Sequence, residues 1–479
     1  MAASAEGTQR FAERTRRELP PHAFRALGPT GLTVSALGFG TYRVDERTPH
    51  QSAALRQAIA SGINLIDTST NYMDGSSERA IGAVLREVPR DEIVVISKAG
   101  YVQGQAMALA RTREAEGKPF PEMVKYMDGC WHCIHPEFLA DQLTRSLGRL
   151  QIPRVDVYLL HNPEYFFADA AKKRARTPTA TLRAEFYDRI ARAFAHLESE
   201  VSAGRIAWYG VSSNSFGDPD SDPEATSIER MLEIAKGVAN PHHFAVVQLP
   251  ANLFETGPML TRNNAGGTQS ALAFTAANKL AALVNRPVNA YRNGKLTRLA
   301  DAPGVPPASD AISAAAVVLK LEAESPGKRV AWGQQLMAAA KPVQSMSEWL
   351  NIEAQVRAQS KRIADAGAHL TGAAAEQYRS WLQRYAPALE ALLSALGAEC
   401  AARGQEATRG IHARLNPFLP PAWQGQTLSR KAMAVLVNTP GVTCVLNGMR
   451  RPEYVTDALG ALAEPQFAAG PELFDALGR

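Results

Sequence analysis

The sequence predicts an α/β fold, a (β/α)8 TIM barrel with an all-α insertion, and three observations support this prediction. Eight short apolar runs recur along the 479 residues, and amphipathic patterns typical of helices lie between them. Near-continuous apolar strands that alternate with amphipathic helices indicate a parallel sheet covered by helices, and eight such units close a barrel. The first run ends "LGFGTYR", without the G-x-G-x-x-G segment that opens the first helix of many doubly wound sheets.

The expected elements follow from the length and periodicity of each run. Strands are expected at 32–40, 63–69, 92–100, 155–162, 207–214, 244–252, 280–288 and 441–448. Helices are expected near 51–61, 77–88, 136–149, 185–203, 227–237, 270–279, 427–438 and 452–463. Each strand therefore has a helix that can return the chain to the next strand of the barrel.

One interval is far longer than a standard unit, because an alanine-rich helical stretch separates the seventh strand from its helix. Proline- and glycine-rich junctions, "APGVPPAS" and "LNPFLPPAWQG", flank this stretch and suit a domain boundary. A strand-to-helix loop opens on the catalytic face of a barrel, so we expect the insertion to form a helical cap beside the mouth. The predicted domains are an N-terminal extension (1–24), the first part of the barrel (25–304), the insertion (305–420), and the last barrel unit with a C-terminal tail (421–479).

Composition excludes several classes of protein. A net charge of +5 over so long a chain gives no argument for a nucleic-acid partner. No apolar run reaches the roughly 18 residues that a membrane span needs, and the N-terminus lacks the apolar core of a secretory signal. Four cysteines make no disulfide framework. We therefore expect a cytoplasmic protein without a nucleic-acid or membrane partner.

Four polar residues stand at the ends of three consecutive predicted strands. Asp67 ends the second strand and Tyr72 follows in its turn, Lys98 ends the third strand, and His161 ends the fourth. Each has an ordinary interpretation alone: a cap, a surface tyrosine, a solvated lysine or a core histidine. Because the carboxyl ends of barrel strands converge on one face, we expect all four side chains to meet there.

Such a cluster can move a proton. We expect the Lys98 ammonium to lower the pKa of the Tyr72 phenol, and Asp67 to hold the lysine charged and oriented. His161 can donate to a carbonyl oxygen beside the tyrosine. Tyr72 would then be the general acid that reduction of a carbonyl requires, and a cofactor would supply the hydride.

The segment "GCWHCIH" holds four potential zinc ligands within six residues, Cys130, His132, Cys133 and His135. Such crowding makes it awkward for all four to close one tetrahedron, and no second cysteine pair lies nearby. We therefore predict no metal site, and we expect this loop to shape the substrate pocket.

The chain resembles the aldo-keto reductase family. The resemblance lies in "LGFGTYR", "GINLIDTSTNYMDGSSERAIG", "ISKAG", "VDVYLLHNPE", "GRIAWYGVSSNS", "VVQLPANLFE" and "CVLNGMRRPEYVTDAL", in the order that the family has them. It implies that Asp67, Tyr72, Lys98 and His161 are a catalytic tetrad with Tyr72 as proton donor. It further implies a cofactor site formed by Gly40, Thr41, Tyr42, Asp67, Ser212, Ser213, Asn214, Gln248, Asn285, Arg286, Gly448, Arg450, Arg451, Tyr454 and Asp457.

The sequence departs from the family pattern at three positions. Asn285 stands where many relatives stack an aromatic ring on the nicotinamide, and Tyr454 and Ala458 replace commoner polar residues. Arg450 and Arg451 could bind the 2′-phosphate of NADP. The cofactor implied is NADP(H), with NAD possible.

Two hypotheses of different classes follow. In the first, the protein is an NADP-dependent enzyme that interconverts an aldehyde or ketone and the corresponding alcohol. In the alternative, it is a non-catalytic scaffold that binds the nicotinamide cofactor and recruits a partner through the insertion. The sequence names neither the substrate, the physiological direction nor the oligomeric state.

Overall fold

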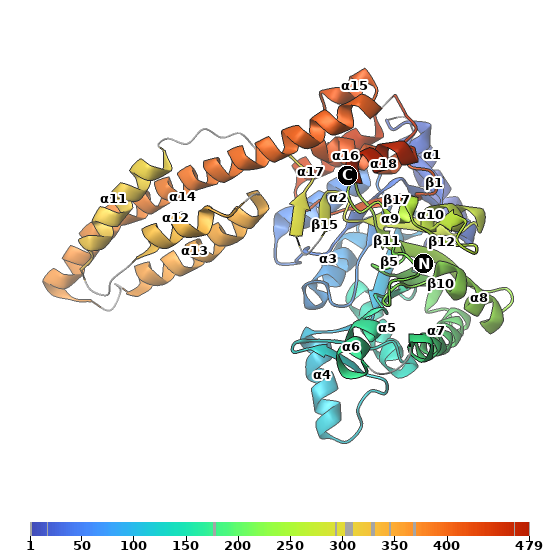
Figure 1. The fold of residues 1–479 in the computed structure, drawn as a ribbon. Coiled ribbons are helices and arrows are strands. Elements are labelled where there is room, and N and C mark those ends of the chain that lie inside the picture. The colour runs from blue at the N-terminus through green and yellow to red at the C-terminus, as the bar shows by residue number, and fades with distance from the viewer. Residues whose placement is uncertain are drawn as a thin grey trace. The chain divides into compact units, whose positions relative to one another are not determined.

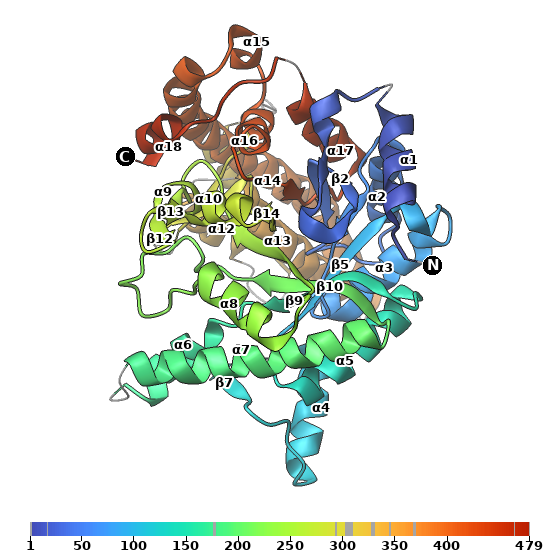
Figure 2. The same ribbon diagram turned by 90° about the vertical axis from the view of Figure 1, so that its right-hand side faces the viewer.

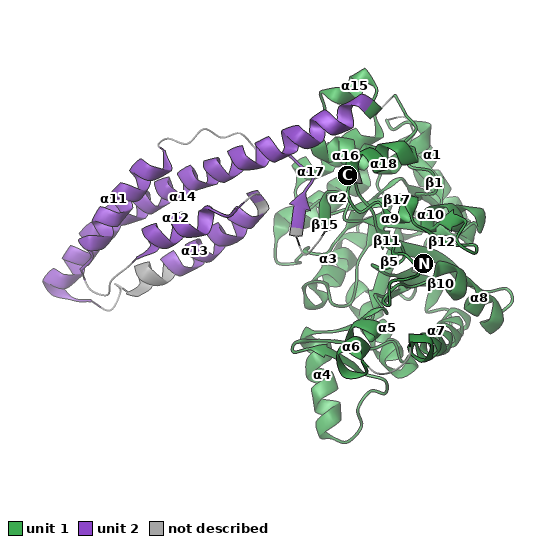
Figure 3. Ribbon diagram, viewed as in Figure 1, with its two compact units in different colours: residues 1–295, 418–479 green, residues 296–417 purple. Residues whose placement is uncertain are grey.

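A computed structural model describes residues 2–16, 18–175, 179–292, 295–301, 310–326, 331–343, 346–366, 370–463 and 465–478. The chain divides into two compact units (Figure 3). Unit 1 comprises residues 1–295 and 418–479, and unit 2 comprises residues 296–417. The predicted start of the insertion, at 305, lies outside the described residues, so the predicted boundaries stay predictions.

Unit 1 is a closed barrel of eight parallel strands, which confirms the predicted fold class. Each strand pairs with the strands that precede and follow it in the barrel's chain order, and the last pairs with the first. Figures 1 and 2 show these strands inside a ring of helices. The strands are β3 (Leu37–Gly40), β4 (Leu65–Asp67), β5 (Val94–Ala99), β9 (Val155–His161), β10 (Ile206–Ser212), β11 (Phe244–Pro250), β14 (Ala281–Asn285) and β17 (Cys444–Asn447).

The helices of the ring cover the barrel with their apolar faces. Helix α5 is typical: Pro136 occupies its first turn, and Phe138, Leu139, Leu143 and Leu150 are buried on one face. The ring consists of α2 (Pro49–Ala60), α3 (Ser76–Leu85), α5 (Pro136–Leu150), α7 (Thr179–Ser202), α8 (Ile228–Val238), α10 (Ala271–Ala277), α16 (Leu428–Val437) and α17 (Pro452–Leu459).

The first predicted strand, at 32–40, divides in two. Its first part is β2 (Thr33–Ser35), which pairs antiparallel with β1 (Phe24–Ala26), and only β3 enters the barrel. Asn64 accounts for part of this division, because its side chain accepts from the Ser35 N–H at 2.8 Å and donates to the Thr33 carbonyl at 2.9 Å. The hairpin therefore ends where the barrel begins.

The N-terminal extension packs on unit 1. Helix α1 (Ala5–Thr15) begins after Ser4, whose side chain accepts the Gly7 N–H. Arg10 and Arg14 of α1 pair with the buried Glu92 at 3.0 and 2.6 Å. These ion pairs fix α1 to the segment that enters β5.

Residues 101–135 form an excursion after β5. Strands β6 (Tyr101–Val102), β7 (Val124–Met127) and β8 (Cys130–His132) make a three-stranded sheet in the order β6-β8-β7. A small core that includes Val102, Met107, Phe120 and Cys133 holds the sheet and α4 (Gly104–Ala115) together. Besides short 3-10 helices, unit 1 and its junctions also contain α6 (Tyr165–Lys173), α9 (Gly257–Leu260), β12 (Arg262–Asn264), β13 (Gln269–Ser270), β15 (Asn289–Arg292), β16 (Lys295–Arg298), α15 (Pro421–Gln424) and α18 (Pro471–Gly478).

Unit 2 is helical, which confirms a helical insertion after the seventh barrel strand. It contains α11 (Ala311–Ala323), α12 (Trp332–Ala340), α13 (Met346–Ala366) and α14 (Gly372–Leu415). A core of its own joins them, in which Trp381 donates from Nε1 to the Leu321 carbonyl at 2.7 Å. Its role as a cap stays a prediction. Throughout the described ranges of both units, no helix combines the length and apolar character that crossing a membrane requires.

Candidate active site

The structure brings the four predicted catalytic side chains together at the carboxyl ends of three neighbouring strands. Asp67 is the last residue of β4, Lys98 lies near the end of β5, and His161 is the last residue of β9. Tyr72 lies in the turn after β4, and its ring meets the His161 ring edge-on with centroids 5.9 Å apart. Convergence of parallel strand ends is the reason for this meeting.

Lys98 is the centre of the cluster and is fully buried. Its Nζ donates to Asp67 Oδ2 at 2.8 Å, to the Thr68 carbonyl at 2.8 Å and to the Tyr72 hydroxyl at 3.4 Å. These three acceptors use the three protons of an ammonium group. The lysine is therefore held as a donor to the phenol oxygen.

The structure corrects one expectation, the direction in which the pKa of Tyr72 is displaced. Burial raises the pKa of the Tyr72 phenol well above its usual value, and the charges of Asp67 and Tyr42 add to that rise. Burial also lowers the pKa of Lys98, and Asp67 opposes that shift. Desolvation of the phenolate outweighs the attraction of the ammonium. Tyr72 is consequently a protonated phenol at neutral pH, the form that a proton donor needs.

The other carboxylate oxygen of Asp67, Oδ1, is linked by hydrogen bonds to three of the predicted cofactor residues. Gln248 of β11 donates to Asp67 Oδ1 at 2.8 Å and accepts from Ser212 Oγ at 3.1 Å and Asn285 Nδ2 at 3.4 Å. The other polar atom of Asn285, Oδ1, is buried and has no hydrogen-bond partner. A buried acceptor without a partner is costly unless a ligand supplies a donor.

The next residues after β10 are held by a buried carboxyl group that the sequence did not single out. Glu164 accepts the Asn214 N–H at 2.8 Å, and burial raises the pKa of Glu164 to about 7. The Ser213 hydroxyl forms hydrogen bonds with the hydroxyls of Ser215 and Thr226. Arg286 forms an ion pair with Glu255 at 2.9 Å. Ser213 and Arg286 thus have protein partners already.

The first strand supplies the next predicted group, Gly40, Thr41 and Tyr42. Gly40 ends β3, and Thr41 donates from its amide and its hydroxyl to the Asp67 carbonyl at 3.0 and 2.9 Å. Tyr42 is 62% exposed, and its ring meets that of Tyr72 edge-on at 5.3 Å. Tyr42 therefore forms an open wall beside the tetrad.

The last predicted group follows β17. Gly448 is exposed directly after the strand, and Arg450 is half-buried. Burial lowers the pKa of Arg450, and the neighbouring charges of Arg43 and Arg451 lower it further. Arg450 thus lies close enough to two other cations to be repelled by them, an arrangement that an anion would stabilise, although Arg451 also pairs with Glu453 at 3.6 Å.

Two other predicted residues lie on α17. Tyr454 is 40% exposed. The Asp457 carboxylate accepts from Ser429 Oγ at 2.6 Å and from Arg430 Nε at 2.9 Å, which ties α17 to the start of α16. In this structure Asp457 therefore serves the packing of two helices.

The segment at 130–135 gives each side chain a different partner. His132 Nε2 lies 2.7 Å from the His161 carbonyl oxygen, the Cys133 thiol donates to the Pro121 carbonyl at 3.4 Å, and Cys130 Sγ contacts Gln103. Across the described part of the chain, no group of three or more His, Cys, Asp or Glu side chains could hold a metal ion. His132 instead packs against Tyr165, beside Tyr101 and His161.

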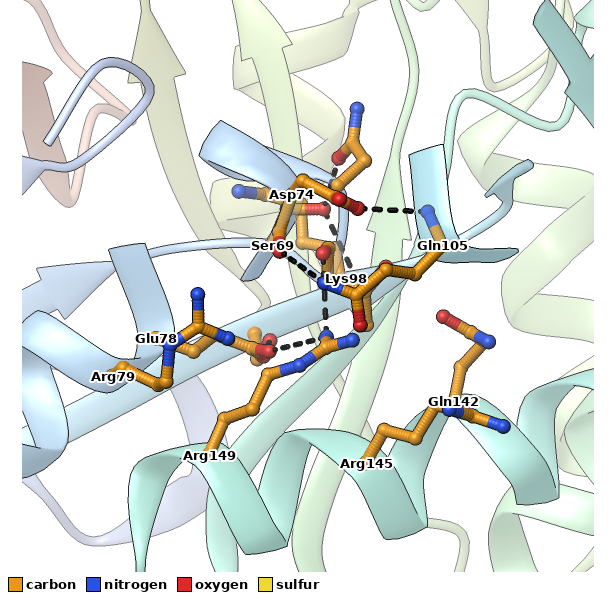
Figure 4. Close-up of polar contacts among 12 residues, drawn as sticks. Ser69, Asp74, Glu78, Arg79, Lys98, Gln105, Gln142, Arg145 and Arg149 are labelled. Atoms are coloured by element: carbon orange, nitrogen blue, oxygen red, sulfur yellow. Dashed lines mark hydrogen bonds and ion pairs between the residues drawn. The ribbon is translucent and has the colours of Figure 1, made fainter. Parts of the chain in front are cut away.

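The turn that carries Tyr72 is supported from below by Arg149 of α5, which the sequence did not reveal. Arg149 Nη1 donates to Glu78 at 3.1 Å and to the Thr70 carbonyl at 3.4 Å (Figure 4). A Cβ atom on Gly75, which has a φ of +83°, would lie 2.6 Å from Arg149 Nε. The guanidinium therefore packs directly under the turn.

We expect Arg149→Leu to lower the free energy of unfolding of the barrel by about 3 kcal/mol, because the fully buried Glu78 would lose its cation. Arg145→Leu is the matched control. Arg145 lies one helical turn away on α5 (Figure 4), and it pairs with Asp141 near the surface. That change should cost no more than about 0.5 kcal/mol. Urea unfolding followed by circular dichroism measures both. Equal losses in the two variants would contradict the buried pair's role.

Comparisons with known proteins find sequence similarity to one family. A model described as the aldo/keto reductase family matches residues 36–256. The chain is 31% identical to NADH-specific methylglyoxal reductase of Escherichia coli (strain K12) over 143 residues, 28% of this chain and 40% of that protein. It is 31% identical to D-threo-aldose 1-dehydrogenase of Pseudomonas sp over 168 residues, 33% of this chain and 50% of that protein.

The chain spans half or less of the length of these two curated relatives. A solved aldo-keto reductase from Bacillus halodurans is 15% identical, with a TM-score of 0.48 and coverage of 95% of this chain and 96% of that one. The matched residues run from just before β3 to just past β11. This range contains β4 and its turn, β5, β9 and β11, which carry the tetrad and Gln248. The part of the chain that matches the aldo/keto reductase family model is therefore residues 36–256, somewhat less than half of its length.

Proposed function

We propose that this chain is an oxidoreductase that interconverts an aldehyde or ketone and the corresponding alcohol with NADP(H). The observation that carries the proposal is the buried cluster in which Lys98 donates to both Asp67 and the Tyr72 hydroxyl. A protonated phenol held by an ammonium group is suited to give a proton to a carbonyl oxygen. The names of the two curated relatives, a reductase and a dehydrogenase, support the same class of reaction.

The residues at the mouth fit a nicotinamide cofactor, which would supply the hydride. Asn285 Oδ1 is a buried acceptor that an amide N–H can satisfy, and Gln248 and Ser212 lie beside it. These side chains would bind the carboxamide end. Arg450, with Arg43 and Arg451 nearby, would bind the 2′-phosphate, the group that NADP carries and NAD lacks.

The protein's own part in the reaction is to bind, orient and move a proton. Tyr72 would donate its hydroxyl proton to the substrate oxygen in reduction and accept it back in oxidation. Lys98 would stabilise the phenolate that remains, and Asp67 would keep Lys98 charged. His161 would hold the substrate oxygen next to Tyr72, because both rings border the same space.

The test is turnover of reduced cofactor with a panel of small aldehydes, ketones and aldose sugars. We expect loss of NADPH absorbance with at least one carbonyl, and a lower KM for NADPH than for NADH. Fluorescence titration of NADPH binding serves as the control for a correctly folded cofactor site. Protein that binds NADPH and consumes none with any carbonyl would overturn the proposal.

A further inference from the structure

His161 stands at one end of a chain of polar side chains that runs from the barrel to the sheet at 101–135. Ser69 Oγ lies 2.9 Å from His161 Nδ1 and 2.7 Å from the amide of Asn71. Asn71 Nδ2 lies 3.0 Å from Gln103 Oε1, and Gln103 Nε2 lies 3.3 Å from Cys130 Sγ. Ser69 is fully buried, so its hydroxyl has only these partners and the Lys98 carbonyl at 3.2 Å.

This chain can run in either of two directions. In the first, Gln103 donates to Cys130, Asn71 donates to Gln103, and Ser69 donates to Asn71. A serine hydroxyl has one proton, so Ser69 can then only accept from His161, which must carry its proton on Nδ1. If both amides turn end for end, oxygen and nitrogen exchange places, every bond reverses, and Ser69 donates to Nδ1.

The direction matters because His161 is neutral. Burial lowers the pKa of the His161 imidazole well below its usual value, and the charges of Lys98 and His132 lower it further. A neutral imidazole carries one proton, on Nδ1 or on Nε2. The Ser69 bond therefore decides whether Nε2, the nitrogen left for a substrate, is a donor or an acceptor.

We propose that both amides stand turned end for end from their orientation in the structure, in which Gln103 and Asn71 donate toward Cys130. The chain of donors then runs from the Cys130 thiol through Gln103, Asn71 and Ser69 to His161, so that His161 presents Nε2–H to the substrate oxygen. This inference rests on the proposed function. Ser69, Asn71 and Gln103 are then positioning residues that set the tautomer of a catalytic residue without touching the substrate.

Two points favour this direction. An amide oxygen is a stronger acceptor for the Cys130 thiol than the thiol sulfur is for an amide N–H. A carbonyl oxygen that accepts from Tyr72 has a second lone pair, which Nε2–H can satisfy and a bare Nε2 would repel.

The substitution Gln103→Glu tests the proposal by reversing the chain. A carboxylate only accepts, so Asn71 must donate to it, Asn71 must accept from Ser69, and Ser69 must accept Nδ1–H from His161. We expect the His161 proton to move from Nε2 to Nδ1 and kcat for carbonyl reduction to fall by about tenfold to a hundredfold. The ring nitrogens are observed by NMR of the 15N-histidine-labelled full chain, with His161 assigned by its loss in H161Q.

Gln105→Glu is the matched control, because it adds the same charge two residues away on an exposed side chain outside this chain of bonds. We expect the wild-type tautomer and a kcat within about threefold of wild type. Wild-type protein with its proton on Nδ1, or a Q103E variant whose tautomer does not change, would overturn the proposal.

The NMR result does not depend on turnover. Absence of carbonyl reduction in wild-type protein would therefore defeat the proposed function alone, and the tautomer would still be read from the ring nitrogens.

Discussion

Replacing Tyr72 by phenylalanine is expected to lower kcat for carbonyl reduction by about a thousandfold. The change removes the hydroxyl that Lys98 contacts at 3.4 Å and that we propose to be the proton donor. The ring itself can remain, because its edge-on contacts with Tyr42 and His161 involve no hydroxyl. The affinity for NADPH should therefore stay within about threefold of wild type, so the loss should lie in kcat.

Steady-state kinetics and NADPH titration on the same preparations measure these two quantities. Tyr101→Phe is the matched control, because Tyr101 also lies against His161, at 4.7 Å between ring centroids, and its hydroxyl accepts from Asn162 at 2.9 Å. We expect Y101F to lose no more than about tenfold, since its hydroxyl has no contact with Lys98 or Asp67. A Y72F variant that reduces carbonyls as fast as Y101F would contradict the assignment of Tyr72 as proton donor.

The sequence predicted the barrel because periodicity and strand ends are local properties. Apolar runs and amphipathic helices are read residue by residue, and the geometry of a parallel barrel then places strand ends such as Asp67 and His161 on one face. The arrangement of these side chains thus followed from counting strands. Their proposed roles in catalysis remain a prediction for the experiments above.

Contacts that depend on the path of a loop were not predictable in this way. Gln103 and Cys130 meet only because the excursion at 101–135 folds into a sheet, and no periodicity encodes that pairing. Arg149 occurs in an ordinary amphipathic helix pattern, and nothing in the sequence marks Glu78 as its buried partner. Such interactions join elements whose relative packing the sequence pattern does not specify.

The pKa of Tyr72 shows a second limit. From the sequence, the nearby Lys98 suggested a lowered pKa, since a cation favours phenolate. The structure gives the opposite direction because the hydroxyl is buried and Asp67 lies close to it. The sign depends on the depth of burial, a property of the packed protein that a list of neighbours does not give.

The substitution Lys98→Met should lower kcat in both directions, by about a hundredfold or more. Methionine keeps much of the length and apolar volume of the lysine stem but removes the ammonium. Tyr72 then loses the cation that favours phenolate, so its pKa, already raised by burial, should rise further. Alcohol oxidation requires the phenolate and speeds up as pH rises, so its pH–rate curve should move to higher pH. Reduction uses the protonated phenol, so raising the pH should not lower the reduction rate of K98M any more than it lowers that of the wild type.

Lys431→Met is the matched control for removing a buried ammonium. Lys431 is also fully buried, and its Nζ donates to the Gln424 carbonyl at 2.6 Å, on α16 outside the barrel. Loss of this donor to a buried carbonyl should destabilise the protein, whereas kcat and the pH–rate curve of the folded fraction should stay unchanged. If the pH–rate curve for alcohol oxidation is the same in K98M as in K431M, the role of Lys98 is only to pack in the buried site and to pair with Asp67. A displacement toward higher pH in K98M alone would instead tie the ammonium to the ionisation of Tyr72, through the same 3.4 Å contact that supports the proposed reaction.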